Sequence, residues 1–308
     1  MHKKKILIIL ITLFLTACAP VQKTRIISAV KENGSIAVYF CPQDNCQQQL
    51  INLINSANKS VRCAFYKLEL PEIIKVLKGK NAEIIMDIDR NSSALMHNKF
   101  CIIDNKAVAT GSFNPTEYGD RYNNNNLVII HSKYLAQNYE DEFNELRQNR
   151  FGKGNKVRYP LIYLNNIKIQ NYFCPEDNCA EHIIEELKKA KKSIYFMTFT
   201  FTHNSIANII ALKIHHNVTV KGIIEKSRQS RYSKFDFLEF QGAEMHFDKN
   251  PKIMHHKVFI IDNKTVITGS MNPTWSADNK NDENIIIIHD REIAKKFLKE
   301  FEELIQNG

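Results

Sequence analysis

The sequence predicts an α/β fold made of two pseudo-symmetric halves, each a mixed β-sheet flanked by helices. Three observations carry this prediction. The chain has 308 residues, enough for one large domain or two ordinary ones. Short apolar runs typical of strands alternate along it with segments of helical periodicity. A motif-bearing segment also occurs twice in register, which indicates an internal duplication.

The duplication appears as two matches with different offsets. Residues 39–42 recur as 172–175 at an offset of 133, and residues 96–116 match 254–274 at an offset of 158. The second half therefore carries about 25 extra residues, which fall around 226–249. The expected boundaries are 35–150 for the first half, 151–160 for a Gly- and Pro-containing link, and 161–308 for the second half.

Each half should contain the same elements in the same order. Apolar runs of four to seven residues predict strands, and Asp44 or Asn45 can cap the first helix. In the first half the expected strands are 35–40, 61–66, 83–88, 100–103, 107–110 and 126–131, and the expected helices are 45–59, 70–77 and 134–147. The second half repeats this pattern over 167–306, and its extra segment adds a helix at 235–240 and a strand at 243–247.

Composition excludes several classes of protein. Apolar residues make up 44% of the chain and charged residues 24%, so wholesale disorder is excluded. No apolar stretch is as long as about 18 residues, which excludes a polytopic membrane protein. The balance is basic, with 42 Lys and Arg against 33 Asp and Glu. This excess favours a polyanionic partner, either nucleic acid or an anionic lipid surface.

The first residues have the pattern of an export signal. Three lysines precede a ten-residue apolar run at 6–15, too short to span a membrane. The run ends at Leu15-Thr16-Ala17-Cys18, which looks like a bacterial lipobox with Cys18 as the lipidated residue. We expect a signal peptide at 1–17, a tether at 18–34, and a membrane-anchored lipoprotein facing the periplasm or the cell exterior. An ordinary secretory signal is the alternative.

Four cysteines lie in a duplicated hexapeptide. In an exported protein, short-range disulfides Cys41–Cys46 and Cys174–Cys179 are the expected pairing. A four-cysteine zinc site is the competing interpretation. Cys63 and Cys101 lie in apolar strand-like runs, and we expect both to be buried as small hydrophobic residues.

The repeated motif is His-x-Lys-x4-Asp-x6-Gly-Ser-x-Asn. Its two copies are His97, Lys99, Asp104, Gly111, Ser112 and Asn114, and His255, Lys257, Asp262, Gly269, Ser270 and Asn272. Residues two apart on a strand share a face, so each His and Lys should point the same way. Two facing copies would place two imidazoles beside a point held by two lysines and two amides. That set suits a phosphodiester, with one His attacking phosphorus and the other protonating the leaving oxygen.

At these residues the sequence resembles the phospholipase D superfamily, the HKD-motif phosphodiesterases, over essentially the whole chain after the signal. The resemblance implies two phospholipase D-like halves with the active site at their interface. It also implies a two-step reaction through a phosphohistidine, without a metal or cofactor. His97 would be the nucleophile and His255 the general acid, although the symmetry leaves the reverse open. The remaining motif residues would bind phosphate (Lys99, Lys257, Asn114, Asn272), support the site (Ser112, Ser270) or brace it (Asp104, Asp262).

The family also places an acidic residue downstream to hold a histidine Nδ1–H. Glu283 stands 28 residues after His255, and its counterpart in the first half is Asn125. By resemblance this acid reaches across the pseudo-twofold axis, so we expect Glu283 near His97. A carboxylate stabilises an imidazolium and an amide does so weakly. The two histidines should therefore differ in pKa and role.

The substrate stays open between phospholipid and nucleic acid. A phosphoric diester hydrolase acting on phospholipid head groups, a phospholipase D, suits a lipid anchor and a basic surface. An endonuclease of the same superfamily is the alternative, supported by charge and aromatic residues at 226–234 and at 118–122. Phosphatidyl transfer of the cardiolipin synthase type and a non-catalytic anchored binding protein are less favoured. Because both motifs are in one chain, we expect a monomer.

Overall fold

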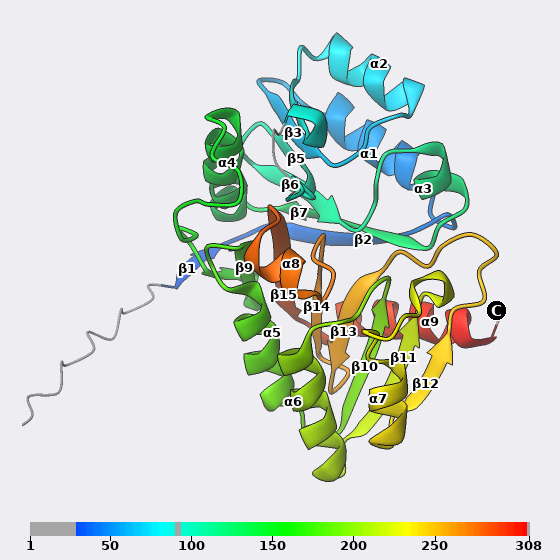
Figure 1. The fold of residues 1–308 in the computed structure, drawn as a ribbon. Helices are drawn as coiled ribbons and strands as arrows, with labels where there is room; N and C mark the ends of the chain where they lie inside the picture. Colours follow the sequence, from blue (N-terminus) through cyan, green and yellow to red (C-terminus); the bar gives the residue numbers. More distant parts are fainter. Residues whose placement is uncertain (1–28, 90–93, 307–308) are drawn as a thin grey trace, which may run out of the picture.

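The computed structural model describes residues 29–89 and 94–306, which fold into two mixed β-sheets packed face to face (Figure 1). The expected signal peptide and Cys18 lie outside the described residues. The six-stranded sheet has the order β2 (Ser35–Cys41), β7 (Asn125–His131), β6 (Ala107–Gly111), β5 (Lys99–Ile103), β3 (Val61–Phe65) and β4 (Glu83–Met86). The nine-stranded sheet has the order β1 (Val30–Glu32), β8 (Leu161–Leu164), β9 (Ile167–Cys174), β15 (Glu283–His289), β14 (Thr265–Gly269), β13 (Lys257–Ile261), β10 (Ser193–Thr198), β11 (Thr219–Ile224) and β12 (Glu244–Phe247).

Helices cover the outer faces of both sheets and close the space between them (Figure 1). The outer helices are α1 (Cys46–Asn55) and α2 (Pro71–Gly79) in the first half, and α5 (Cys179–Lys188), α6 (Asn204–His215) and α7 (Phe235–Phe240) in the second. Helices α4 (Lys133–Arg147) and α9 (Arg291–Gln306) pack into the core between the sheets. The α/β class and the two pseudo-symmetric halves are thus confirmed.

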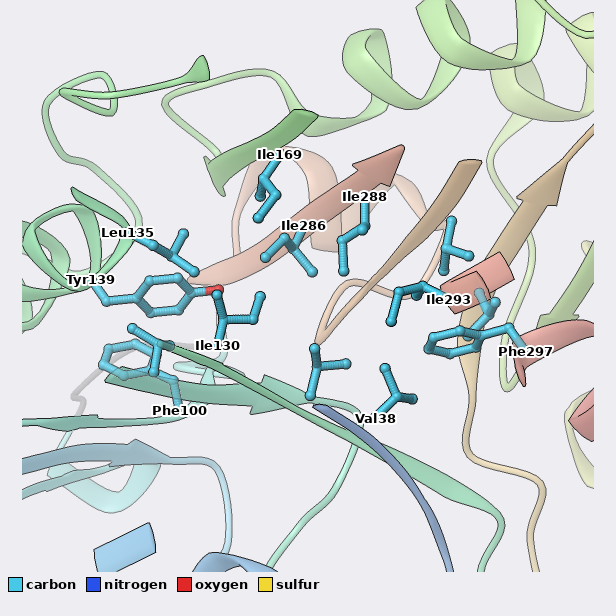
Figure 2. Packing of buried hydrophobic residues seen from close by; sticks show 14 of the residues in the cluster. Val38, Phe100, Ile130, Leu135, Tyr139, Ile169, Ile286, Ile288, Ile293 and Phe297 are labelled. Atoms are coloured by element: carbon cyan, nitrogen blue, oxygen red, sulfur yellow. The ribbon is translucent and has the colours of Figure 1, made fainter. Parts of the chain in front are cut away.

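The central core joins the two halves. Figure 2 shows Phe100 and Ile130 of the first sheet facing Ile286 and Ile288 of the second, with Tyr139 of α4 at one side. All five side chains are almost fully buried. Removing this much apolar surface from water is the main stabilisation of such an interface. The two halves therefore form one folded unit, and their relative position is fixed by packing.

Two matched hydrogen bonds show the pseudo-twofold relation. Thr110 Oγ1 donates to Asn284 Oδ1, and Thr268 Oγ1 donates to Asn126 Oδ1, each at 2.9 Å. Each bond crosses the interface: Thr110 of the first half bonds to Asn284 of the second, and Thr268 of the second half bonds to Asn126 of the first. All four side chains are buried, so these polar groups are satisfied only when the halves meet in this register.

The motif aspartates brace the sheets at a distance from the histidines. Asp104 accepts hydrogen bonds from the backbone N–H groups of Asn58, Lys59 and Ser60. Burial would raise its pKa, but these bonds and Lys106 lower it below the usual value. Asp262 likewise accepts hydrogen bonds from the backbone N–H groups of residues 191–193. Asp104 follows the last residue of β5 and Lys99 is the first, so about 15 Å of strand separates them.

Three points of the predicted elements need correction. Residues 30–32, expected in a tether, form β1, which pairs in parallel with β8. Glu32 accepts from Lys133 N and Tyr134 N at the start of α4, which holds this segment in the fold. The first helix ends at Asn55 rather than 59. Short helices α3 (Glu117–Arg121) and α8 (Trp275–Asn279) follow the two motifs and were not expected.

The structure pairs all six described cysteines. Cys41–Cys46 and Cys174–Cys179 are disulfides as expected, so no four-cysteine zinc site is formed by these residues. Cys63 and Cys101 are buried, but they form a third disulfide, and their expected state as unpaired hydrophobic residues is wrong. The reason is register, because Cys63 of β3 lies directly opposite Cys101 of β5.

Replacing both Cys63 and Cys101 with Ala should lower the free energy of unfolding by about 2–4 kcal/mol, since this bridge closes the longest of the three loops. Urea denaturation of the oxidised proteins measures the loss. The matched control is the Cys41→Ala/Cys46→Ala double variant, whose six-residue loop should contribute less. Mass spectrometry of the unreduced protein should show three linked pairs; free thiols at 63 and 101 would contradict the pairing.

Candidate active site

The backbone of each motif histidine is held at the interface by a hydrogen bond to the opposite half. His97 N donates to Asp282 O at 2.9 Å, and His255 N donates to Asn124 O at 2.8 Å. Both imidazoles are nearly buried, with 6% and 8% of the residue exposed. The main chain of one half therefore positions the histidine of the other.

Glu283 orients His97. Its Oε2 lies 2.8 Å from His97 Nδ1 and accepts from Ser270 Oγ at 2.6 Å. Because a carboxylate only accepts, Nδ1 carries the proton and Nε2 is the ring nitrogen presented to a substrate. Glu283 is completely buried, so its charge acts on the imidazole with little screening. The expected contact across the pseudo-twofold axis is confirmed.

Asn125 occupies the equivalent place beside His255. Its Oδ1 lies 2.9 Å from His255 Nδ1, and Ser112 O lies 3.1 Å from the same nitrogen. Ser112 Oγ donates to Asn125 Oδ1 at 3.2 Å, as Ser270 does to Glu283. The two histidines thus have the same tautomer and geometry, but only His97 faces a negative charge.

Two lysines and two aromatic rings complete the surroundings of the histidines. Lys99 Nζ donates to His97 O at 2.5 Å, and Lys257 Nζ donates to His255 O at 2.7 Å. Tyr66 packs against His97 with ring centroids 4.8 Å apart, and Phe199 packs against His255 at 4.9 Å. The lysine ammonium groups lie 5.1 and 5.0 Å from these same rings. The aromatic walls were not predicted from the sequence, although positions 66 and 199 share the offset of 133 that relates the cysteine hexapeptides.

The motif asparagines offer polar atoms that the described chain leaves unused. Oδ1 of Asn114 and Oδ1 of Asn272 are both buried, and within the described residues neither accepts a hydrogen bond. A buried polar atom without a partner is costly. An amide oxygen only accepts, so whatever satisfies these two equivalent atoms must bring a hydrogen-bond donor, such as a water molecule or a hydroxyl group.

Burial and like charge lower the pKa of the basic groups. Burial lowers the pKa of His97, and Glu283 partly opposes this. Burial together with Lys257 and Lys99 lowers the pKa of His255 well below the ordinary value. Burial lowers the pKa of Lys99 to about 7, and burial together with Lys99 lowers that of Lys257 well below its usual range. An anion bound between these groups would favour their charged forms.

The structure therefore brings eight of the predicted residues into one site across the interface: His97, Lys99, Ser112, Asn125, His255, Lys257, Ser270 and Glu283. It does not bring Asp104 and Asp262 there, because both sit at the far ends of their strands. The resemblance implied that they brace the site itself; they brace the sheets instead, at residues 58–60 and 191–193.

One carboxylate cluster among the described residues has the spacing of a metal site. Carboxylate oxygens of Glu142, Glu145 and Glu176 lie within 4.8 Å of one another, beside a cavity of about 810 Å³. Burial raises the pKa of Glu142, and burial raises that of Glu176 to about 7. Glu145 pairs with Arg150 at 3.3 Å. Burial thus favours the protonated forms of Glu142 and Glu176, and Arg150 pairs with Glu145.

Comparison with known proteins decides the family. The family model described as cardiolipin synthase, PLD-like domain, matches residues 76–147 and 183–305, more than half of the chain. The chain belongs to the phospholipase D superfamily. Both matched regions contain a complete His-x-Lys-x4-Asp-x6-Gly-Ser-x-Asn motif.

Named relatives of this superfamily match about half of the chain. A protein called phospholipase D from Rickettsia conorii is 34% identical over 142 residues, 46% of this chain and 71% of that protein. A mitochondrial cardiolipin hydrolase from Xenopus tropicalis is 33% identical over 151 residues, 48% of this chain and 70% of that protein. The solved phosphatidylserine synthase of Haemophilus influenzae aligns with a TM-score of 0.68 at 13% identity, covering 87% of this chain and 86% of that one, and supports the fold.

Lys99→Met should raise the free energy of unfolding at about pH 6 by about 1–3 kcal/mol. A folded-state pKa of about 7 against about 10.4 in the unfolded chain means that folding disfavours the ammonium form. The penalty is complete below pH 7. It disappears as pH rises towards about 10, because the unfolded state binds more protons in that window. The gain in free energy of unfolding in the variant should therefore shrink as pH rises. Urea denaturation at about pH 6 and at about pH 10 measures the difference. Exposed Lys106→Met is the control; an equal gain at both pH values would contradict this account.

Proposed function

We propose that this protein is a phospholipase D-type phosphodiesterase that hydrolyses the head-group phosphodiester of phospholipids through a phosphohistidine. The pairing of His97 with Glu283 and His255 with Asn125 carries this proposal. It provides two opposed imidazoles of different electrostatic character, which a double displacement at phosphorus requires.

In the first step, Nε2 of His97 attacks phosphorus and the P–O bond to the head group breaks. Imidazolium His255 gives its proton to the departing alkoxide, so the alcohol leaves neutral. Glu283 stabilises the positive charge that His97 gains as the P–N bond forms. Lys99 and Lys257, with Asn114 and Asn272, bind the non-bridging oxygens, where negative charge is concentrated.

In the second step, neutral His255 takes a proton from water, and the hydroxide attacks phosphorus. The P–N bond breaks, phosphatidate leaves, and His97 returns to its neutral form, with the proton still on Nδ1 and hydrogen-bonded to Glu283. His255 regains the proton that it gave in the first step. Binding of the anionic diester favours protonated His255, although the pKa of this group is lowered in the free site.

Phospholipid is the substrate class that we favour. Relatives named phospholipase D and cardiolipin hydrolase support it, as does the excess of Lys and Arg over Asp and Glu. A lipid anchor at Cys18 would hold the catalytic body near its substrate at the periplasmic or outer surface of a membrane. None of the helices within 29–89 and 94–306 has the length and apolarity to cross a membrane.

An endonuclease is the second candidate, and one observation favours it. Arg228 of the inserted segment is exposed and lies 4.4 Å from the centroid of Phe199, the ring that packs against His255. Arg231 lies 4.7 Å from Tyr232 on the same segment. Cations and aromatic rings together are typical of single-strand binding surfaces.

The test is hydrolysis by the purified protein of phosphatidylglycerol, single-stranded DNA and RNA, each with a chelator present. We expect phosphatidate from the lipid, at a rate unchanged by the chelator, because the lysines supply the positive charge that a metal would otherwise provide. His97→Asn is the inactive control. Cleavage of DNA or RNA alone would establish the second candidate, and activity that vanished in chelator and returned with magnesium or zinc would contradict the proposed chemistry.

A further inference from the structure

We propose that the surface flanking the active site docks on an anionic phospholipid bilayer through an aromatic rim, defined as Tyr118, Tyr122 and Lys252 on one side and Trp275 and Lys280 on the other. The proposal rests on phospholipid as substrate. It assigns the orientation in which the protein meets the membrane, with the rings at head-group level and the site facing the lipid phosphates.

Large apolar side chains are exposed beside the site. Trp275 is 58% exposed and Tyr118 is 56% exposed. Both belong to short helices that begin directly after the motif asparagines, α3 after Asn114 and α8 after Asn272. Ile88, which is 86% exposed, directly follows Asp87, whose carboxylate accepts from Met96 N beside His97. These exposed groups therefore lie on segments that follow or precede the motif residues in each half, where an interaction surface would flank the site.

The backbone ties the aromatic rim to the catalytic groups. Gly119 O in α3 accepts from Asn125 Nδ2, and Asn125 holds His255. Asn250 Nδ2 donates to Tyr122 O, which joins α3 to the loop between β12 and β13; Figure 1 shows this loop beside α3. Docking through these residues would therefore bring the site itself to the membrane surface.

The charges of the rim suit an anionic lipid surface. Lys252 Nζ lies 5.6 Å from the Tyr118 ring and 5.9 Å from the Tyr122 ring. Lys280 Nζ lies 5.2 Å from the Trp275 ring. Both lysines are exposed, and each lysine near such a membrane contributes about 1 kcal/mol of attraction. Tryptophan and tyrosine beside lysine are the residues that anchor proteins at the head-group level.

A bilayer explains this surface better than a nucleic-acid strand does. The aliphatic side chain of Ile88 offers no stacking face, but it would gain by leaving water for the apolar boundary of a bilayer. The phosphate of a phospholipid also lies at head-group depth, where the rings would sit.

Trp275 is the one tryptophan in the 308-residue chain, so its fluorescence reports directly on the rim. Adding vesicles of phosphatidylglycerol and phosphatidylcholine to the purified protein should shift its emission to shorter wavelength, and salt should weaken the effect. Vesicles of phosphatidylcholine alone should shift it little. No shift with anionic vesicles would overturn the proposal, as would a response to single-stranded DNA in place of vesicles.

Variants give a second measurement. The double variant Tyr118→Ala/Tyr122→Ala and the single variant Lys252→Glu should each lower the affinity for anionic vesicles by tenfold or more. Co-sedimentation of the protein with the vesicles measures this affinity. Phe240→Ala is the matched control. Phe240 is also strongly exposed, at 86%, but it lies at the end of α7, at the start of the chain that leads through β12 to the site. Equal losses in the control and the rim variants would overturn the proposal.

Activity separates this proposal from the proposed function. Rim variants should lose more activity on anionic vesicles than on a short-chain phosphatidylglycerol kept below its micelle concentration. If the wild type shifts its Trp275 emission on vesicles but hydrolyses neither lipid, docking stands and the proposed function fails. If it hydrolyses both lipids and the rim variants lose activity equally on each, the proposed function stands and docking fails.

Discussion

Incubated with a slow phosphodiester substrate, the His255→Asn protein should accumulate the substrate's phosphorus on His97, still esterified to its remaining alcohol, whereas the His97→Asn protein should accumulate none. His97 presents Nε2 to the substrate, and its Nδ1 faces a buried carboxylate that stabilises the cation formed on attack. His255 faces only an amide and a carbonyl oxygen. Loss of His255 removes the acid from the first step and the base from the second, so the intermediate persists.

The measurement is acid-quenched mass spectrometry of peptides containing residue 97 or 255, with turnover measured in parallel. Turnover should fall by at least about 10⁴-fold in the His97→Asn protein, the size of effect seen when a nucleophile is removed. Native circular dichroism and unfolding midpoints exclude a folding defect. Phosphate recovered on His255 in the His97→Asn protein would reverse the assignment of nucleophile and acid.

The sequence predicted those parts of the fold that follow from local pattern. The duplicated motif and the alternating apolar runs located almost every strand within one or two residues, and Asn45 caps α1 through a bond from Gln48 N as expected. The hairpin between β5 and β6 was also predicted, with its turn at Asn105 and Lys106; the positive φ angles lie at Asp104 and Asn105, one residue earlier. Such residues have a local physical reason to be where they are.

Features that depend on distant partners could not be predicted. The Cys63–Cys101 disulfide depends on which residues of β3 and β5 lie opposite each other, and register is set by the whole sheet. The three-residue β1 is stabilised by Glu32 at the N-terminus of α4, about a hundred residues away. Helices α3 and α8 have five residues each, too few to show a helical period.

The candidate site shows the same division. The motif residues were predicted because they recur at a fixed spacing, and Glu283 because the resemblance to the superfamily places an acidic residue downstream of the motif. Nothing in the sequence distinguishes Tyr66 and Phe199 from other aromatic residues. Only the folded chain shows that their rings lie against the histidines and lysines. The same holds for Asp104 and Asp262, since the length of a strand carries them away from the lysines with which they share the motif.

Glu283→Gln should slow phosphoryl transfer to His97 by roughly 10³–10⁴-fold, in line with loss of the orienting carboxylate in other histidine-based sites. An amide at this place can still accept from Nδ1, but it lacks the charge that stabilises the imidazolium. Glu142→Gln is the matched control. Glu142 is also a buried glutamate, and it bonds to Asn98 next to His97 without touching the imidazole; its replacement should change the rate little. Single-turnover kinetics with mass spectrometry measure the transfer.

The decisive form of this experiment exchanges the two orienting groups. The double variant Glu283→Gln/Asn125→Asp moves the carboxylate from His97 to His255 while keeping both hydrogen-bond acceptors in place. Since the surrounding lysines and serines are paired by the pseudo-twofold axis, the roles of the histidines should exchange, and phosphate should be trapped on His255. If phosphorus were still trapped on His97, the position of the carboxylate would not determine which histidine is the nucleophile. An unchanged rate in Glu283→Gln alone would remove this residue from the chemistry.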